Sequence, residues 1–427
     1  MSDIPRLTVG QTSIRLNVKP ETVYSYISRG LLSSQRSSGG STLDALEVEA
    51  FAQQRGRAPV SSTSREDGSR YSSHGAPLMI LDTNISQVID GQLYFRGIAV
   101  EELVARYHFE SVAAWLWGEP LNSSHRFKAN AEDTRNAANF VAALPRFASP
   151  LDKVSAALLA LGAGDPLRHA SQENVAGLGA GLISGIVSSL NQARHKTYRS
   201  TDHQSIADGI RAAFGPTQDA NPKSLRAIDA ALVLLVDHDL AISTLAARAA
   251  ASARATIYGG ISSAIGALDS KLHGNASQDA AGLISLALEY DSPEKALAES
   301  IAANGRMVPG FGHALYPDGD PRARILLEIL HQETPNSPAL RAVGSLSRVM
   351  ENRTRLDPNI DLALAALLHV EGMAPDAGPA IFAIARSAGW IAHMADEYGR
   401  APMRMRPHGR YSGPAPSEAS GTPEQPE

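Results

Sequence analysis

The chain from Leu362 to Met394 reads LALAALLHVEGMAPDAGPAIFAIARSAGWIAHM. Apolar residues recur in it at helical spacing, and similar patterns rich in alanine and leucine cover Val100–Trp117, Asn174–Leu190 and Leu225–Ala253. Such periodicity indicates buried α-helices. Alternation that predicts strands occurs only around Leu78–Phe95. We therefore expect an all-α fold with a short β element at the start of this body.

Composition excludes several classes of protein. The chain has 427 residues, enough for about three structural units at roughly 150 residues each. It contains no cysteine, which excludes disulfide frameworks, thiolate nucleophiles and cysteine-ligated zinc. Its 39 basic and 44 acidic side chains give a net charge of −5, so no overall basic field attracts nucleic acid. Because the sequence has neither a signal peptide nor an apolar run of about 18 residues, we expect a cytoplasmic protein that does not enter a membrane.

Changes in composition divide the chain. Serine, threonine, glycine and proline crowd residues 58–77, which predicts a linker. Residues 414–427 have no aliphatic or aromatic side chain larger than alanine, which predicts a disordered tail. A small domain at residues 1–57 and a large body thus remain as the folded parts.

The small domain has the pattern of helix, turn and helix. A helix is expected to end at Leu16 and a second to run from Pro20 to Arg29, with proline in its first turn and Gly30 at its end. A β wing is predicted over residues 31–42 and a closing helix from about Leu43 to Arg55.

One face of the second helix has the chemistry of a nucleic-acid surface. Val23 and Ile27 should face inward, and Tyr26 outward with short polar and basic residues that suit base edges and phosphates. The candidate DNA-contacting residues are Lys19, Thr22, Ser25, Arg29 and Arg36. Through Pro20-Glu21-Thr22-Val23-Tyr24 and Ser28-Arg29-Gly30-Leu31-Leu32, this segment resembles the MerR or excisionase type of winged helix-turn-helix. Such domains bind DNA or mediate assembly with other proteins, and both alternatives stay open.

Histidines and charges in the body suggest a site for an anionic ligand. The body contains no G-x-S-x-G, H-E-x-x-H or P-loop motif. His238 lies between two aspartates, whereas His273 and His313 lie beside glycines that permit close approach of a ligand. Arg322 follows His313 closely, and Arg386 lies in an apolar helix, where a buried cation needs an anion. Asp361 stands at a predicted helix start, where an N-cap is an alternative role.

The order of these motifs resembles that of citrate synthases and 2-methylcitrate synthases. The matching stretches are Tyr94-Phe95-Arg96-Gly97, Asp237-His238-Asp239, Leu272-His273-Gly274, Pro309-Gly310-Phe311-Gly312-His313, Asp320-Pro321-Arg322-Ala323, Pro358-Asn359-Ile360-Asp361, Gly389-Trp390-Ile391-Ala392-His393 and Arg406-Pro407. The resemblance implies a homodimer of two-domain subunits. Residues 78–272 and 373–413 would form a large domain and residues 273–372 a small one.

The resemblance also implies an acyltransferase that condenses acetyl-CoA or propionyl-CoA with oxaloacetate to citrate or 2-methylcitrate. No metal and no cofactor are implied. The implied catalytic residues are Asp361 as the base, His273 on the thioester oxygen and His313 on the ketone. The implied oxaloacetate ligands are His238, Arg322 and Arg386, with Arg406 supplied by the partner subunit. The loop with Pro309, Gly310, Phe311 and Gly312 would lie near the CoA adenine.

Three departures from the family pattern concern the substrates. Asn275 with Ser277-Gln278 replaces a second glycine and an Asn-Glu pair, Leu362-Ala363-Leu364 replaces an aromatic-Ser-Gly, and Ala314 and Pro317 stand where basic residues are common. An alternative function is a DNA-binding transcriptional regulator that senses an acyl-CoA or oxoacid on this scaffold. The choice between acetyl and propionyl groups stays open, because one methylene changes binding by only about 1–3 kcal/mol.

Overall fold

The computed structural model describes residues 6–37, 40–56, 80–122, 125–166, 168–170, 174–195, 205–216, 222–270, 274–290, 292–304 and 308–413. The predicted linker (58–77) and the predicted disordered tail (414–427) lie outside these residues.

The N-terminal group comprises the described part of residues 6–56. Its elements are β1 (Arg6–Thr8), α1 (Val9–Leu16), α2 (Pro20–Ser28), β2 (Ser34–Ser37), β3 (Gly40–Asp44) and α3 (Ala45–Gly56). Their order is the predicted one, with β1 as an additional strand in an antiparallel sheet of order β1-β3-β2. A capping box starts α1, because the Thr8 hydroxyl accepts from the Gln11 amide while the Gln11 side chain accepts from that of Thr8.

The prediction for Tyr26 is wrong. Val23 is buried as expected, but the Tyr26 ring packs edge-on against Phe51 of α3, with ring centroids 5.1 Å apart. The Arg55 guanidinium lies 5.3 Å from the centre of the Tyr26 ring. Because an aromatic ring gains more from such packing than from water, Tyr26 joins α2 to α3 instead of presenting itself to a partner.

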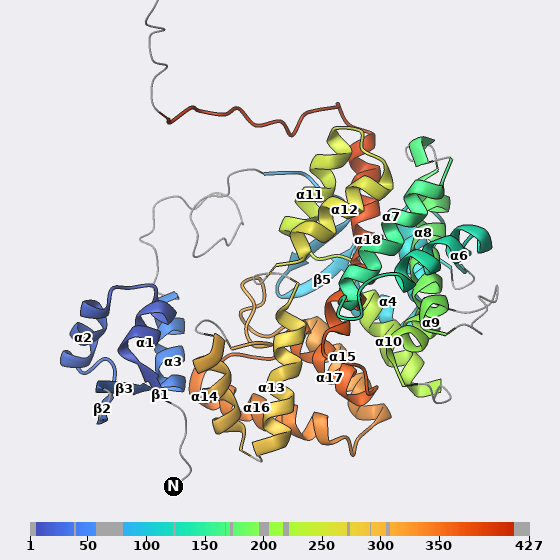
Figure 1. Cartoon of the computed structure of the whole chain (residues 1–427). Helices are drawn as coiled ribbons and strands as arrows, with labels where there is room; N and C mark the ends of the chain where they lie inside the picture. The colour runs from blue at the N-terminus through green and yellow to red at the C-terminus, as the bar shows by residue number, and fades with distance from the viewer. Residues whose placement is uncertain are drawn as a thin grey trace, which may run out of the picture.

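Helix α3 attaches the N-terminal group to the body. It contacts α14 (Pro293–Asn304) and α16 (Pro338–Thr354), as Figure 1 shows. No residue from Ala45 to Gln53 is exposed, so both sides of this helix are covered. An ion pair of 3.3 Å between Asp44 and Arg353 lies at the edge of this contact.

The body begins with the predicted β element. Strands β4 (Ser86–Ile89), β5 (Gln92–Phe95) and β6 (Ile98–Ala99) form an antiparallel sheet. The helices that follow are α4 (Val100–Arg106), α5 (Phe109–Leu116), α6 (Ala131–Ala142), α7 (Pro150–Gly164), α8 (Val175–Arg194), α9 (Ile206–Phe214), α10 (Pro222–Leu235), α11 (Ile242–Ser252) and α12 (Ile257–Leu268), with a 3₁₀ turn at Arg168–Ala170. The predicted all-α body is thereby confirmed.

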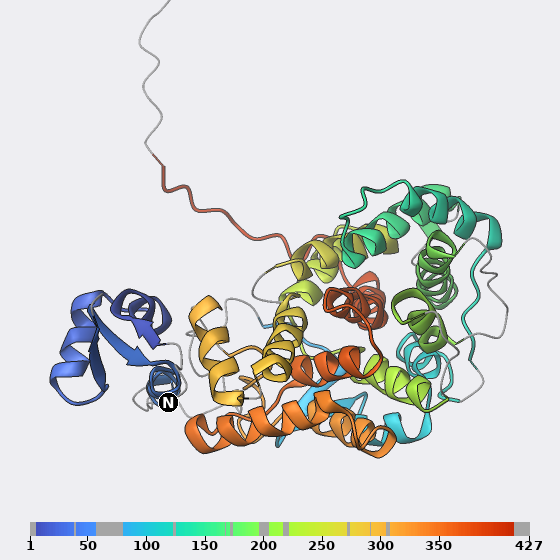
Figure 2. The same ribbon diagram turned by 60° about the horizontal axis from the view of Figure 1, so that its bottom comes forward.

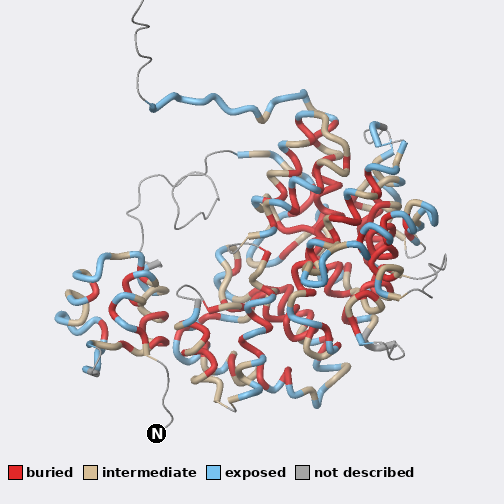
Figure 3. Tube along the Cα trace, viewed as in Figure 1, coloured by how far each residue is buried: buried red, intermediate tan, exposed pale blue. Residues whose placement is uncertain are grey.

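Helix α18 (Ala377–Tyr398) forms the centre of this part of the body. Figure 2 shows it nearly end-on, with α7, α8, α10, α11 and α12 around it. Every residue from Ala377 to Met394 is buried, which explains the nearly continuous apolar sequence of this helix. Beyond α18, residues 401–413 leave the body as a mostly exposed segment (Figure 3).

A second helical group contains α13 (Ala276–Tyr290), α14, α15 (Pro321–Glu333), α16 and α17 (Ile360–Val370). These helices pack mainly on one another, and α15 and α17 also contact α10. We call them the α13–α17 group. None of the described helices is long and apolar enough to cross a membrane.

Replacement of Glu49 by alanine tests the core of the N-terminal group. Its fully buried carboxylate accepts two bonds from the Arg15 guanidinium, of 2.6 and 2.5 Å. Loss of one partner from a buried pair costs about 3–5 kcal/mol. Hydrogen exchange of residues 6–56 should therefore accelerate strongly. The control Arg353→Ala removes a half-exposed ion pair and should cost only about 0–1 kcal/mol; equal exchange in both variants would contradict the prediction.

Candidate active site

The carboxylate of Asp320 connects the starts of α15 and α17. It caps α15 by accepting from the Arg322 amide at 3.0 Å. It also pairs with the Arg322 guanidinium through two bonds of 2.9 and 2.8 Å, and one oxygen accepts from the Ile360 amide at 3.0 Å. Arg322 and Asp361 are thereby held in one region of the fold.

The loop before α15 is paired with the segment that enters α17. The Gly312 amide donates to the Asp357 carbonyl at 2.8 Å, and the Asn359 amide donates to the Gly310 carbonyl at 2.9 Å. Gly310 has φ of +81°, and a Cβ there would lie 2.7 Å from the Leu362 side chain. Glycine is thus required both for the conformation and for the close approach. The pairing carries His313 toward the start of α17.

Asp361 is a carboxylic acid with an unusual environment. The N-cap of α17 is Asn359, whose side chain accepts from the Asp361 amide at 3.0 Å, so the N-cap role considered for Asp361 is wrong. Desolvation by the surrounding protein raises the pKa of Asp361 to about 6, although Arg322 opposes the shift. At neutral pH most of this group is an anion whose basicity exceeds that of an ordinary aspartate.

Two histidines and a tyrosine form the neighbouring wall. The rings of His238 and His313 lie 4.9 Å apart, and the Tyr316 hydroxyl lies 2.9 Å from His238 Nε2. Burial, with Arg322 as the next cause, lowers the pKa of His313 to about 4 and that of His238 well below its ordinary value. Both imidazoles are therefore neutral at pH 7. Because Nδ1 of His313 accepts from the Leu315 amide at 3.2 Å, its proton resides on Nε2, where it can be donated to a ligand.

Arg386 contributes a buried cation from the middle of α18. Its Nε donates to the Leu235 carbonyl at 2.7 Å, and its side chain is 1% exposed. No carboxylate of the described residues forms an ion pair with it, in contrast to Arg322. Burial lowers the pKa of Arg386 to about 10, which leaves it charged at neutral pH. A buried cation without a direct ion pair favours the binding of an anion.

A family comparison accounts for this arrangement. The sequence model described as "Citrate synthase, C-terminal domain" matches residues 76–408. The chain belongs to the citrate synthase family. The match covers the body and excludes the whole N-terminal group.

Individual relatives agree with this family. The 2-methylcitrate synthase 2 of Corynebacterium glutamicum is 28% identical over 78% of this chain and 92% of its own length. Citrate synthase 2 of Bacillus subtilis is 26% identical over 78% of this chain and 93% of its own. The citrate synthase of Thermoplasma acidophilum, solved with carboxymethyl coenzyme A and oxaloacetate, has the same fold, with a TM-score of 0.66 at 22% identity over 81% of this chain and 97% of that protein.

The structure brings most, but not all, of the predicted site residues of this citrate synthase family member together. Five of them are close enough for their charges to shift one another's pKa values, namely His238, His313, Arg322, Asp361 and Arg386. The other predictions have different outcomes. His273 lies outside the described residues, and Arg406 is exposed on the segment that follows α18. In the loop of Pro309, Gly310, Phe311 and Gly312, the Phe311 side chain is 1% exposed, so only its backbone can face a ligand.

Sequence reasoning missed Tyr316 and did not assign a role to Asp320. Tyr316 is 3% exposed, and its ring packs against the rings of both His238 and His313. Its position three residues after His313 was the available signal. Asp320 was noticed only as part of Asp320-Pro321-Arg322, whereas its bonds to Arg322 and Ile360 depend on the packing of two helices.

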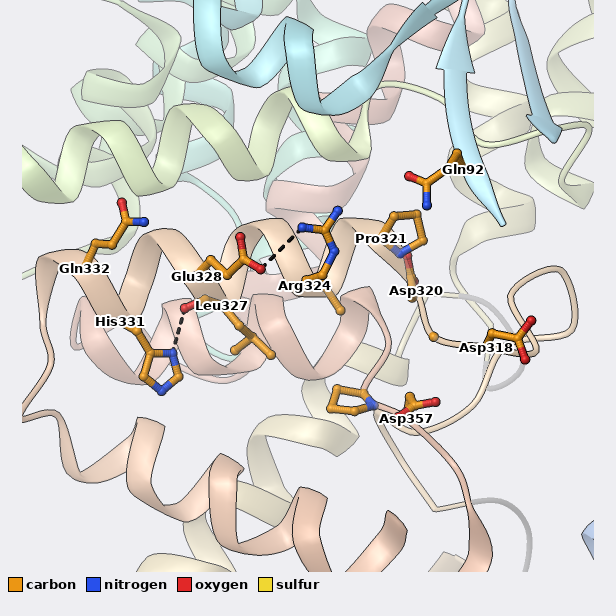
Figure 4. Close-up of a pocket in the computed structure, with 13 residues that line it drawn as sticks. Gln92, Asp318, Asp320, Pro321, Arg324, Leu327, Glu328, His331, Gln332 and Asp357 are labelled. Carbon is orange, nitrogen blue, oxygen red and sulfur yellow. Dashed lines mark hydrogen bonds and ion pairs between the residues drawn. The ribbon is translucent and has the colours of Figure 1, made fainter. Parts of the chain in front are cut away.

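A groove of about 660 Å³ runs along α15 beside this site and shares Asp320 with it (Figure 4). Its lining includes Asp318, Asp357 and Glu328. The basic residue Arg324 in it already contacts Glu101 and Glu328. Because carboxylates outnumber free cations in the groove, it is a poor receptor for the anionic substrates of this family. The buried cluster, rather than the groove, is the candidate active site.

Titration of Asp361 tests the electrostatics of the site. A pKa of about 6 means that the protonated fraction grows as the pH falls through 6 and that the anion dominates at pH 7. Infrared difference spectra of wild type minus Asp361→Asn should show a protonated carboxyl band with a midpoint near pH 6. A midpoint near 3.8, the value of an ordinary aspartate, would contradict the assigned environment.

Proposed function

We propose that this citrate synthase family member condenses acetyl-CoA or propionyl-CoA with oxaloacetate and releases CoA. The observation that supports this most directly is Asp361, a carboxylate of raised pKa, in the same buried cluster as the unpaired guanidinium of Arg386. The first group is suited to remove a proton from carbon, and the second to bind an anionic oxoacid.

In the proposed reaction, Asp361 takes a proton from the carbon next to the thioester carbonyl. The electron pair moves onto the thioester oxygen and forms an enolate. A donor to that oxygen is needed, and the family resemblance assigns this role to His273. The partly desolvated surroundings of Asp361 increase its basicity at neutral pH, where it remains ionised.

The enolate carbon then attacks the ketone carbon of oxaloacetate. His313 is proposed to donate its Nε2 proton to the ketone oxygen as negative charge develops there. Arg386, Arg322 and His238 are proposed to hold the two carboxylates. Hydrolysis of the thioester by water finally releases the product and CoA, with no metal or cofactor required, as in other citrate synthases.

The acyl group and the assembly are further parts of the proposal. The relatives include both a 2-methylcitrate synthase and a citrate synthase, so propionyl-CoA and acetyl-CoA are both to be tested. We propose a homodimer in which the exposed Arg406 of each subunit reaches the partner's site. From Arg386 to the end of α18 is 12 residues, or about 18 Å of helix, which separates Arg406 from the site of its own subunit.

Release of CoA provides the test of the reaction. A thiol-reactive dye reports it without background, because the protein has no cysteine. We expect oxaloacetate-dependent thiol release with one or both acyl-CoAs, and a loss of at least about 100-fold in Asp361→Ala because general base catalysis is removed. Asp376→Asn is the control, since this aspartate at the start of α18 makes no capping bond and should leave the rate unchanged. A wild-type rate in Asp361→Ala would show that the base is another group.

We also propose DNA binding by the N-terminal group as a second function. The supporting observation is the distribution of its charges. Glu49 is neutralised by Arg15, Asp44 pairs with Arg353, and Glu47 accepts bonds from Ser33. In the part of the chain that the structure describes, the exposed basic residues Lys19, Arg29 and Arg36 carry no ion pair. Near α2 these three basic residues outnumber the exposed acid Glu21, so the local charge is more positive than the overall net charge indicates.

Salt-dependent binding tests this second function. A Lys19→Ala, Arg29→Ala, Arg36→Ala triple variant should bind duplex DNA more weakly. The slope of log affinity against log salt should become shallower by about 0.9 for each phosphate that the variant no longer neutralises. Arg106→Ala removes a basic group that pairs with Glu102 in the body and serves as the control. If the full-length wild type binds no fragment from a random duplex library even at low salt, the N-terminal group has another role.

A further inference from the structure

A buried cluster of Ser86, Asp237 and His393 lies directly behind the candidate active site. Asp237 and His393 are both fully buried, and Ser86 is 5% exposed. One oxygen of Asp237 accepts from the Ser86 hydroxyl at 2.5 Å and lies 3.1 Å from His393 Nε2. The Ser86 hydroxyl also accepts from the Asp239 amide at 3.1 Å. These bonds connect strand β4, helix α18 and the turn that contains His238.

The Asp237 carboxyl of this cluster stays ionised although it is fully buried, where a charge is normally unfavourable. Desolvation raises the pKa of Asp237, but His393, Arg386 and Ser86 together lower it by more than desolvation raises it. The pKa therefore lies below its ordinary value, and the carboxyl is ionised. Asp237 is also the charge that most strongly opposes the desolvation of Arg386. A buried carboxylate without a function in the core would normally be disfavoured. Here it compensates a guanidinium that has no ion-pair partner of its own.

The packing of α18 makes this arrangement possible. Arg386, Gly389 and His393 follow one another at spacings of three and four residues and so share one helical face. A Cβ on Gly389 would lie 2.2 Å from the Val236 carbonyl oxygen and 2.9 Å from an Asp237 oxygen. Glycine at this position therefore lets the helix reach the loop that leads to His238. The same face supplies a proposed substrate ligand, Arg386, and a residue behind it, His393.

The turn that contains His238 includes a residue in an uncommon backbone conformation. Asp239 has φ of +52°, an uncommon conformation for a residue other than glycine. Its amide is held by Ser86, and the residue two positions before it is held by His393. His238, which lies between them, is thus fixed from both sides while its ring faces Tyr316 and His313.

We propose that Ser86, Asp237 and His393 are positioning residues for the oxoacid half of the site, an inference that rests on the proposed function. Asp237 balances the charge of Arg386, and its bonds to Ser86 and His393 hold the turn that presents His238. None of the three takes part in proton abstraction at Asp361. Their loss should affect the binding of oxaloacetate and leave that of the acyl-CoA essentially intact.

The test compares His393→Leu with His393→Gln. Leucine removes the bond to Asp237, whereas glutamine retains an N–H donor of similar reach. We expect the KM for oxaloacetate to rise about tenfold or more in the leucine variant, as for loss of a hydrogen bond to a charged group, with the KM for the acyl-CoA unchanged. The glutamine variant should recover most of the loss. Ser86→Ala, which removes one donor to Asp237, should shift the same KM in the same direction and covers the case in which the leucine variant does not fold.

Ser387→Ala is the matched control. Its hydroxyl is buried in the same helix but, among the described residues, bonds only to the Ala383 carbonyl of its own preceding turn. This variant should keep both KM values, and its only expected effect is a lower melting temperature. An unchanged oxaloacetate KM in folded His393→Leu and Ser86→Ala would overturn the inference, as would equal losses for both substrates. Wild-type protein that neither releases CoA nor binds oxaloacetate in calorimetry would instead overturn the proposed function, and this inference with it.

Discussion

The arrangement of the candidate site depends on the buried carboxylate of Asp320. Its two oxygens cap α15, neutralise Arg322 and accept a bond from the first residue of α17. These bonds give two helices that are separate in the sequence a polar connection at the point where they meet. Asp361 is the residue after Ile360, so these bonds also fix its position. The loop of Gly310 and Gly312 pairs with the same segment.

The two arginines of the site differ in their direct partners. Arg322 is compensated by Asp320, whereas Arg386 has only the distributed effect of Asp237 and Asp361. Both histidines are neutral because burial and the arginines oppose a further positive charge. The ionised carboxylates of Asp237, Asp320 and Asp361 offset the two guanidinium charges, but Arg386 forms no direct ion pair with a carboxylate of the described residues and has little access to water. A ligand carboxylate that paired directly with Arg386 would gain more from this contact there than in solution.

The sequence predicted the main features of the fold because they follow from local patterns. Helical periodicity identified the buried helix around Arg386, and Gly30 and Pro20 identified the limits of α2. The position of Arg386 in an apolar helix also indicated an anion site from the sequence alone. The roles of Tyr316 and Asp320, and the true N-cap Asn359, required knowledge of contacts between elements. Tyr26 was assigned to the wrong face because its partner Phe51 lies 25 positions away in the sequence.

The position of α3 has a mechanical consequence for the whole chain. The helix is covered on one side by its own domain and on the other by α14 and α16, so the N-terminal group moves with the α13–α17 group. That group and its loops supply Arg322, His313 and Asp361, whereas His238 comes from the loop after α10 and Arg386 from α18. Since His238, Arg322 and Arg386 are 8%, 2% and 1% exposed, entry of the oxoacid that they are proposed to bind would require the two sets to separate. The face of α2 must change its position relative to α18 in the same movement. Ligands at the two places are coupled through this displacement only where a contact of one ligand differs between the two positions, and any such coupling is by linkage equal in both directions.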